Sequence, residues 1–558
     1  MELATDVVLH VHDKAVKLLQ QVNPLLLTSA TVVTTYSFLY FWNLHRDDIG
    51  IRRRLLRRFF EVVKCVPWVR RKIKDEISKV EESLHKAIHE HDGEHQFLTQ
   101  IPTEAIRADE LIKLVEDYSE LEGPRYLEGK VSGAVFNDEK DLEEMRVYEE
   151  VFKRFAWSNP LWPKLFPGVR KMEAEVIRMC CTLMHGDEES CGTMSTGGTI
   201  SILLACLAHR NRALKRGIRF PEMVIPTSAH AAFTKAAEVF RIRAVRVPVD
   251  PQTFKVDPKK MKSVITRRTC MASLITSSPY AILRNPFQLV GSAPNFPFGT
   301  VDDIVAIGKL GLAYDIPVHV DACLGGFILP FIEDIHPFDF SVPGVCSISA
   351  DTHKYGLSPK GSSVVLYRNN EYLHNQYFCD ADWQGGIYAS STLEGSRSGL
   401  NIALCWASLL FQGFEKYTKH SQSVVETTKK IRNGIKSMPE LRLQGASDVC
   451  IVSWTSDVID IHRLYDLIGK KGWQLTNLQF PSGIHIMVTL NHTGEGVAEA
   501  LLADIRRSID EIKANPNCKL EEAAALYGMA QKIPDRSIVQ EFAYTYLDAC
   551  YSAPKAFL

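Results

Sequence analysis

The stretch Ser349-Ala-Asp-Thr-His-Lys-Tyr-Gly-Leu-Ser-Pro-Lys-Gly-Ser-Ser363 decides how the rest of the chain is interpreted. It links two short apolar runs, 346–349 and 363–367, so Lys354 is predicted to stand on a turn between two strands. A lysine between a histidine and an aromatic residue suits an amine that forms an imine with an aldehyde cofactor. Most lysines are solvated surface charges, so the hypothesis of pyridoxal phosphate depends on the surrounding sequence.

Short β-branched runs alternate with longer helical patterns on both sides of this stretch. The alternation predicts an α/β fold with a mostly parallel sheet covered by helices, in which ligands bind at the carboxyl ends of the strands. From about Phe414 the pattern changes to a smaller α+β domain. The predicted strands are 223–226, 244–248, 316–320, 346–349, 363–367, 449–454 and 484–488, and the predicted helices include 198–214, 229–240, 461–470 and 496–514.

A turn of hydroxyls and glycines precedes one of the predicted helices. Thr196, Gly197, Gly198 and Thr199 stand directly before the apolar run 203–208. Backbone amides at a helix start, with glycines that allow close approach, can bind a phosphate group. A turn that only caps an ordinary helix is an equally good interpretation of this segment alone.

Two further residues follow buried strands. Asp321 ends the predicted strand 316–320, where a carboxylate is costly unless a cation such as a protonated pyridine nitrogen faces it. The alternative is an aspartate that caps the next turn. His230 could stack on a cofactor ring, although a lone histidine is more often a structural residue.

The composition excludes several classes of function. The chain has 558 residues, of which 23% are charged, and a formal net charge of -1. A net charge this small produces no electrostatic field that would attract nucleic acid, and the sequence has no basic segment with interleaved aromatics. A nucleic-acid partner is therefore not expected. The 13 cysteines contain no C-x-x-C pair or histidine-spaced cluster, so no metal site is predicted.

The amino terminus carries a candidate membrane anchor. No Asp, Glu, Lys or Arg occurs between residues 18 and 44, and 22–44 is long enough to cross a hydrocarbon layer of roughly 30 Å as a helix. The segment 52–64 that follows is rich in arginine. Positively charged segments that flank a transmembrane helix usually stay on the cytosolic side of the membrane. We therefore expect a short luminal terminus at 1–21, a single transmembrane helix at 22–44, and basic juxtamembrane and linker helices at 45–110. The amphipathic part 51–66 would contact membrane lipid, and a solvated helix packed on the main domain is the alternative for it. A buried core helix at 22–44 is the alternative.

The chain carries six motifs in order, at 155–161, 195–199, 228–233, 319–327, 349–356 and 382–390. Together they resemble the sphingosine-1-phosphate lyases of the animal, endoplasmic-reticulum-anchored kind. The resemblance covers nearly the whole chain, anchor included. Amino-acid decarboxylases of the glutamate decarboxylase group share the Asp and the His-Lys pair but usually have Asn-Pro-His-Lys where this chain has Asp-Thr-His-Lys.

The resemblance implies a fold-type I, pyridoxal-phosphate-dependent transferase-like homodimer with active sites shared between subunits. The large cofactor-binding domain would span 111–413 and the small domain 414–558. The reaction it implies is retro-aldol cleavage of a phosphorylated long-chain base to a long-chain aldehyde and phosphoethanolamine, at the endoplasmic reticulum membrane with the catalytic domain in the cytosol. An amino-acid decarboxylase and a membrane-tethered inactive homologue are the alternatives.

The resemblance also implies roles for single residues. Lys354 would form the imine, and its pKa would have to fall through imine formation or desolvation before it attacks. The remaining implied roles are phosphate binding by His353 and the turn Thr196, Gly197, Gly198 and Thr199; pairing of Asp321 with the pyridine nitrogen; ring stacking by His230; a loop with Gly385 and Gly386 from the partner subunit; and substrate binding by Asn159, Lys360 and Tyr388.

Three features depart from the family pattern. Phe136 stands where a tyrosine is usual and Trp162 where a histidine is usual, and each change removes a polar group from the expected substrate-phosphate site. An insertion at 272–288 splits a predicted strand, which could form from 271–276 or from 288–290. A retained intron or an error in the gene structure is our hypothesis for this segment. Peptides of the native protein that cross 279–286 would refute it.

Overall fold

The computed structural model describes residues 33–34, 59–60, 63–90, 92, 97–121, 123, 126–265, 286–333, 335–447, 449–515 and 536–553. The predicted luminal terminus and all but two residues of the predicted membrane span 22–44 lie outside the described residues, as does most of the insertion. Among the described helices, none has the length and apolar character that a membrane crossing needs. The chain divides into two units, Met1–Val63 and Lys64–Leu558, and all strands of the described residues lie in the second.

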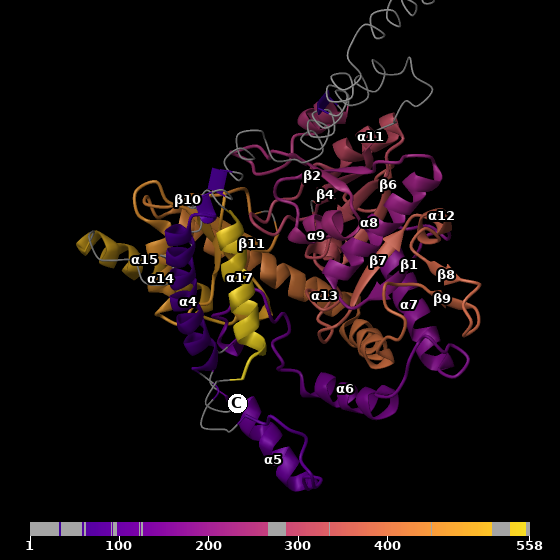
Figure 1. Cartoon of the computed structure of the whole chain (residues 1–558), viewed down its shortest axis with the longest axis horizontal. Coiled ribbons are helices and arrows are strands. Elements are labelled where there is room, and N and C mark those ends of the chain that lie inside the picture. The colour runs from indigo at the N-terminus through magenta and orange to yellow at the C-terminus, as the bar shows by residue number, and fades with distance from the viewer. Residues whose placement is uncertain are drawn as a thin grey trace, which may run out of the picture. The chain divides into compact units, whose positions relative to one another are not determined.

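The larger sheet has seven strands in the order β1-β7-β6-β5-β4-β2-β3 (Figure 1). The five strands from β3 to β6 run parallel, whereas β7 pairs antiparallel with both β6 and β1. The prediction of a mostly parallel sheet is therefore confirmed. The strands are β1 Cys191–Ser195, β2 Glu222–Pro226, β3 Arg243–Val247, β4 Pro286–Ser292, β5 Val318–Asp321, β6 Val345–Ala350 and β7 Ser363–Tyr367.

Helices cover both faces of this sheet, as separate apolar clusters on its two sides indicate. Phe287 and Val290 of β4 pack with side chains of α8, whereas Leu289 packs with α11 and the main core. The predicted helix 198–214 is found as α8, and 229–240 is found as the shorter α9. The helices around the sheet are α7 Pro167–Leu183, α8 Gly198–Lys215, α9 Ala231–Val239, α11 Ile304–Tyr314 and α12 Asn370–Leu373.

Strand β4 shows which of the two predicted half-strands, 271–276 or 288–290, enters the sheet. Residues 286–292 pair with β2 on one side and β5 on the other. The alternative in which 288–290 enters the sheet is therefore confirmed, and the segment 271–276 lies outside the described residues. Phe287 and Gln288, which belong to the insertion, are 2% and 0% exposed, so the insertion contributes directly to the core.

A second sheet lies in the carboxyl-terminal part of the chain, with four antiparallel strands in the order β10-β11-β13-β12. The long helix α13, Gly399–Lys436, is broken at Gly413, whose φ of 58° favours glycine. The other elements are β10 Arg442–Leu443, β11 Ile451–Thr455, α14 Ile461–Gly469, β12 Thr476–Leu478, β13 Gly483–Met487 and α15 Val497–Ala514.

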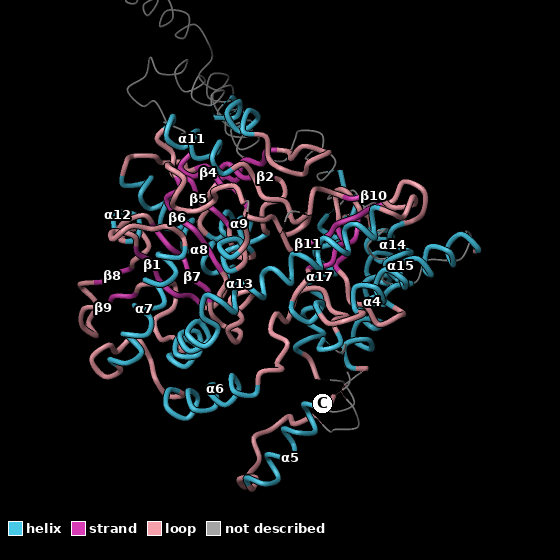
Figure 2. The backbone as a smooth tube through the Cα atoms, turned by 180° about the vertical axis from the view of Figure 1, so that it is seen from behind, coloured by secondary structure: helices cyan, strands magenta, loops and turns pink. Residues whose placement is uncertain are grey.

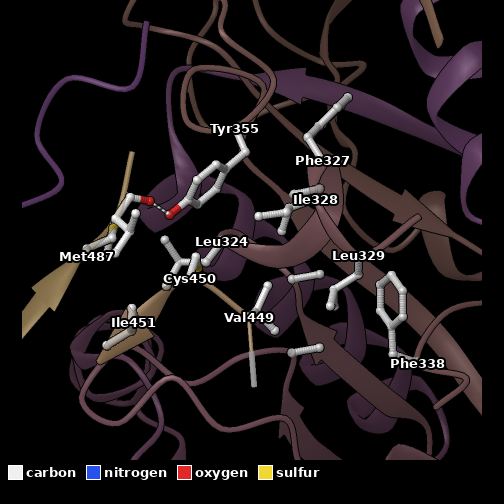
Figure 3. Packing of buried hydrophobic residues seen from close by; sticks show 14 of the residues in the cluster. Leu324, Phe327, Ile328, Leu329, Phe338, Tyr355, Val449, Cys450, Ile451 and Met487 are labelled. Carbon is white, nitrogen blue, oxygen red and sulfur yellow. Dashed lines mark hydrogen bonds between the residues drawn. The ribbon is translucent and has the colours of Figure 1, made fainter. Parts of the chain in front are cut away.

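The two sheets share one apolar core close to the lysine motif (Figure 3). Tyr355 is 6% exposed, and its hydroxyl donates to the carbonyl of Val488 at 2.7 Å. Leu324 and Val449 pack in the same cluster. The residue that follows Lys354 is therefore anchored to the carboxyl-terminal sheet, which restrains the lysine turn.

The remaining helices do not all pack on this core, and helix α5, Ala108–Ser119, stands apart from it (Figure 2). Helix α4, Pro67–His89, packs against α17, Arg536–Tyr551, and the Ser552 hydroxyl lies 3.0 Å from Nε2 of His85. Helix α5, Ala108–Ser119, has no buried residue. The short elements are α6 Leu142–Phe155, β8 Phe378–Asp380, β9 Tyr388–Ser390 and the 3₁₀ turns Tyr126–Glu128, Gly325–Phe327, Leu329–Phe331 and Leu490–Thr493.

Candidate active site

A cavity of about 360 Å³ opens at the carboxyl ends of the parallel strands. This is the edge at which ligands bind in such sheets, and the volume falls in the range of cofactor sites. Eight residues singled out in the sequence line it together: Thr196, Gly197, Gly198, Thr199, His230, Asp321, His353 and Lys354. The other lining residues are Ile200, Ile202, Pro294, Phe296, Cys323, Leu324 and Asp351.

The glycine turn joins β1 to α8 and places the start of that helix against the cavity. A Cβ atom at Gly198 would lie 2.6 Å from both carboxylate oxygens of Asp351, so no larger residue fits there without movement. A Cβ at Gly197 would come within 3.5 Å of the His353 ring. The side chain of Thr196 donates to Glu394 Oε1 at 3.0 Å. The backbone at this helix start is thus brought close to the groups that face it across the cavity.

Asp321 ends β5 and is 7% exposed. Its Oδ1 accepts a hydrogen bond from the backbone N–H of Cys323 at 3.2 Å and one from the Ser349 hydroxyl at 3.4 Å. Because both bonds fall on Oδ1, Oδ2 is the oxygen left for a ligand in the cavity. Asp321 therefore fits both interpretations of its sequence position. Its Oδ1 accepts the hydrogen bond that orders the next turn, and its Oδ2 can still bind a ligand.

Lys354 forms an ion pair with Asp351, with Nζ 2.9 Å from Oδ2. Burial by itself would lower the pKa of Lys354, but the charge of Asp351, followed by Cys323 and Asp321, outweighs it, so the pKa is raised above its usual value. Of the two routes that we expected to lower this pKa, desolvation is therefore insufficient, because a buried carboxylate compensates the ammonium charge. The other route, imine formation, stays a prediction.

The two histidines of the cavity differ in their surroundings. His353 lies with Nε2 3.8 Å from Asp351 Oδ2, and burial lowers its pKa, so it is neutral at neutral pH. The Nδ1 atom of His353 is buried without a partner. His230 caps α9, since its Nδ1 accepts the N–H of Ala232 at 3.2 Å. His230 therefore has a structural role and lines the cavity as well.

The other predicted residues do not line this cavity. Gly385 and Gly386 lie in the turn between β8 and β9, and Tyr388 lies on β9. Asn159 donates to the Ser396 hydroxyl at 3.0 Å. Lys360 donates to the His353 carbonyl at 3.4 Å, and its Nζ stands 5.0 Å from the centre of the Phe136 ring.

Sequence reasoning missed Asp351 as a site residue, although it belongs to the motif around Lys354. An acidic residue three positions before a lysine on a turn was the available signal. Cys323 and Phe296 were also missed. Cys323 Sγ donates to the Ser349 hydroxyl at 3.3 Å, and the Phe296 ring meets the His230 ring edge-on at 6.2 Å.

The cavity fits pyridoxal phosphate on its own chemistry. Asp351 Oδ1 and His353 Nδ1 are buried polar atoms without a partner, which is rare unless a ligand or water completes them. The start of α8 offers backbone N–H groups, Lys354 offers an amine, and Asp321 offers a carboxylate oxygen. A phosphorylated aldehyde with a basic ring nitrogen matches this set of groups.

Comparison with known proteins agrees with this fit. The pyridoxal-dependent decarboxylase conserved domain matches residues 161–455. A sphingosine-1-phosphate lyase of Drosophila melanogaster is 41% identical over 95% of this chain and 95% of its own length, and sphingosine-1-phosphate lyase 1 of Rattus norvegicus is 40% identical over 95% and 90%.

Solved structures show the same relationship. The structure of a sphingosine-1-phosphate lyase of Burkholderia pseudomallei is similar with a TM-score of 0.72 and 33% identity, over 83% of this chain and 99% of that one. A Lactobacillus brevis glutamate decarboxylase, at 20% identity and a TM-score of 0.63, shares the fold over 77% of this chain and 98% of its own. The chain therefore belongs to the sphingosine-1-phosphate lyase family and is a pyridoxal-phosphate-dependent lyase.

Proposed function

We propose that this protein cleaves phosphorylated sphingoid bases, such as sphingosine 1-phosphate, to a long-chain aldehyde and phosphoethanolamine in sphingolipid catabolism. The observation that carries the proposal is the meeting of Lys354, Asp321 and the 196–199 turn in one cavity. The chain that forms this cavity is 41% identical to a sphingosine-1-phosphate lyase over nearly its full length.

The cofactor would be held by groups of known position. The amides of the 196–199 turn and His353 would bind the phosphate, Asp321 Oδ2 would face the ring nitrogen, and His230 would lie against the ring. Lys354 would bind the aldehyde carbon. When bound, pyridoxal phosphate supplies an electron sink for the carbon-carbon bond that breaks.

Lys354 must lose a proton before its amine can act as a nucleophile. Asp351, at 2.9 Å, is the nearest carboxylate and opposes this loss through its charge. We infer that the charge of Asp351 keeps the proton on Lys354 until the aldehyde arrives. Asp351 then accepts this proton, so the proton moves within the pair and is not released to water.

Substrate binding would involve three residues that do not line the cavity. Lys360, Asn159 and Tyr388 are the proposed contacts of the substrate phosphate. Burial lowers the pKa of Lys360, and the charge of Lys354 lowers it further. A partly buried cation of this kind is typical of a site that binds an anion. Phe136 lies under Lys360 and offers a ring face instead of a hydroxyl. We expect Phe136 and Trp162 to weaken phosphate binding relative to relatives with a tyrosine and a histidine.

We further propose a homodimer with shared active sites. The turn with Gly385 and Gly386 is exposed and lies outside the cavity of its own chain, which supports its use in the site of a partner subunit. Helix α5 exposes Leu111, Ile112 and Val115, and an apolar helix face of this kind supports burial against a second copy.

The proposed location is the endoplasmic reticulum membrane, crossed once, with the catalytic domain in the cytosol. Support comes from the uncharged segment 22–44 and the arginines of 52–58. Helix α4 continues this basic character with exposed Arg70, Arg71 and Lys72, which suits a surface of anionic lipid.

One experiment tests the activity against its alternatives. The purified protein is incubated with a phosphorylated sphingoid base and, separately, with acidic and aromatic amino acids, and aldehyde and carbon dioxide are measured. Aldehyde from the phosphorylated base supports the lyase. Carbon dioxide from an amino acid would show a decarboxylase, and absence of both products with bound cofactor would show an inactive homologue.

A further inference from the structure

Two pairs of polar side chains face each other on the central strands β5 and β6. In the parallel register, His319 is the partner of Ser347, and Asp321 is the partner of Ser349. Alternate residues of a strand share one face, so all four side chains point to the same side of the sheet. None is more than 7% exposed. Buried polar groups of this kind must find hydrogen bonds among themselves.

The contacts form one continuous line from the cavity into the protein. The Ser349 hydroxyl lies 3.4 Å from Asp321 Oδ1 and 3.3 Å from His319 Nε2. The Ser347 hydroxyl lies 2.8 Å from His319 Nδ1 and 2.7 Å from Nε2 of His209 on α8. Helix α8 is therefore connected to the cavity at two places. Its first turn lines the cavity directly, and its His209 is linked to the cavity through Ser347, His319, Ser349 and Asp321.

Both histidines of this line are neutral at neutral pH. Burial lowers the pKa of His319 to about 4 and the pKa of His209 well below its usual value. A neutral imidazole has one N–H donor and one acceptor nitrogen, and a hydroxyl has one proton to donate. A hydroxyl that donates to one neighbour in the line can only accept from the other, so the direction of the bond between Ser349 and Asp321 fixes the directions along the whole line.

The carboxylate of Asp321 sets that direction. An ionised carboxylate only accepts, so Ser349 donates to it, and His319 Nε2 must then donate to Ser349. Nδ1 of His319 becomes the acceptor of the Ser347 proton, and His209 Nε2 donates to Ser347.

The far end of the line agrees with this direction. Nδ1 of His209 is left with a lone pair, and this atom is buried without a partner. The reverse direction would bury an N–H without an acceptor, which is rarer than an unpaired acceptor and costly. The reverse direction would also withdraw the Ser349 donor from Asp321.

We propose that His209, Ser347, His319 and Ser349 form a relay of hydrogen bonds, all donated toward Asp321, that fixes the orientation of this carboxylate toward the cofactor ring. The inference rests on the proposed function, because it takes Asp321 as the partner of the ring nitrogen. In this relay His319, Ser347 and His209 are positioning residues. The titratable and charged groups around the line are Cys323, Asp351 and Lys354 at its cavity end and Arg212, Tyr367 and Tyr372 at its far end.

The first test reads the relay without cofactor. Nitrogen chemical shifts of ¹⁵N-labelled histidine side chains in the cofactor-free protein report which ring nitrogen carries the proton. The relay predicts the Nε2–H form for both His319 and His209, with signals assigned by His319→Gln and His209→Phe variants. An Nδ1–H form at His319 would overturn the proposal. This readout stands even if the proposed reaction is wrong.

The second test reads the cofactor. Ser347→Ala should raise the dissociation constant of pyridoxal phosphate about tenfold. Without the Ser347 hydroxyl the tautomer of His319 is no longer fixed, so Ser349 is no longer held as the donor to Asp321. The same variant should shift the midpoint of the pH titration of cofactor absorbance. Ser453→Ala is the matched control, because Ser453 is also fully buried on a strand, but in the carboxyl-terminal sheet, where its hydroxyl donates to Gln444.

The outcomes distinguish a failure of the relay from a failure of the proposed function. His319→Gln keeps an N–H donor for Ser349 and should stay near the wild-type affinity and pH midpoint. If Ser347→Ala does not fold, His209→Phe removes the first donor of the line and takes its place. Equal behaviour of Ser347→Ala and Ser453→Ala would overturn the relay. A wild-type protein that binds no pyridoxal phosphate would instead overturn the proposed function.

Discussion

Lys354 Nζ lies 2.9 Å from Asp351 Oδ2, and Asp351 is 2% exposed. The two residues are three positions apart on one turn, so the contact forms whenever the turn after β6 folds. Asp351 also lies directly against Gly198 at the start of α8. One carboxylate therefore connects the amine of the site with the glycine turn at the start of α8.

Replacing Lys354 should abolish covalent cofactor binding. In Lys354→Ala no amine remains in the cavity to bind the aldehyde, so borohydride treatment should leave this site unlabelled and aldehyde production should be lost. The labelled peptide is identified by mass spectrometry. Lys430→Ala, a surface change at an ion pair with Glu499, is the control and should label normally. Labelling at another lysine in the Lys354 variant would contradict our assignment.

Removing the charge of Asp351 should make Lys354 a nucleophile at lower pH. Asp351 raises the pKa of Lys354, so the ammonium form persists as the pH rises toward that pKa. In Asp351→Asn the proton leaves at lower pH, and the pH profile of the cofactor association rate should move in the acid direction.

The matched control for Asp351→Asn is Asp339→Asn, which alters another buried carboxylate, paired with His185 at 2.7 Å. Stopped-flow absorbance of the cofactor-free protein between pH 6 and pH 10 gives both profiles. A profile for Asp351→Asn that coincides with the wild type would show that this carboxylate does not control the protonation of Lys354.

A methyl group at Gly198 should displace the cofactor phosphate. The added Cβ would lie 2.6 Å from the Asp351 oxygens, so either the turn or the carboxylate has to move. We expect Gly198→Ala to weaken cofactor binding by about tenfold or more, which corresponds to about 1.4 kcal/mol. Gly469→Ala is the control, since nothing lies within 4 Å of its added methyl group. Equal affinities in a fluorescence titration would refute close contact at the turn.

Truncation of Phe287 tests which half-strand enters the sheet. Phe287 is 2% exposed in the cluster between β4 and α8, so Phe287→Ala should lower the free energy of unfolding by about 3–5 kcal/mol. Denaturant unfolding measures the change. Phe414→Ala, at an exposed phenylalanine, should change it little. If the strand were formed by 271–276 instead, the Phe287 variant would be as stable as the wild type.

Much of the candidate site was predictable because each part is local in sequence. The glycines before α8, Asp321 at the end of β5 and Lys354 after β6 each follow a strand, and parallel strands bring their carboxyl ends to one edge. The strand that emerged from the insertion was not predictable, because both half-strands have suitable residues. Pairing with β2 and β5 decided between them.

Local motifs by themselves determined the α/β class of the fold, the cofactor and most residues of the cavity, because strand and helix periodicity and turn chemistry act over a few residues. Only the tertiary structure decided the burial of Asp351 beside Lys354, the close approach of Asp351 to Gly198 at the start of α8, and the alignment of His319 with Ser347. Those features depend on burial and on register between strands, and both arise from contacts between segments far apart in the chain.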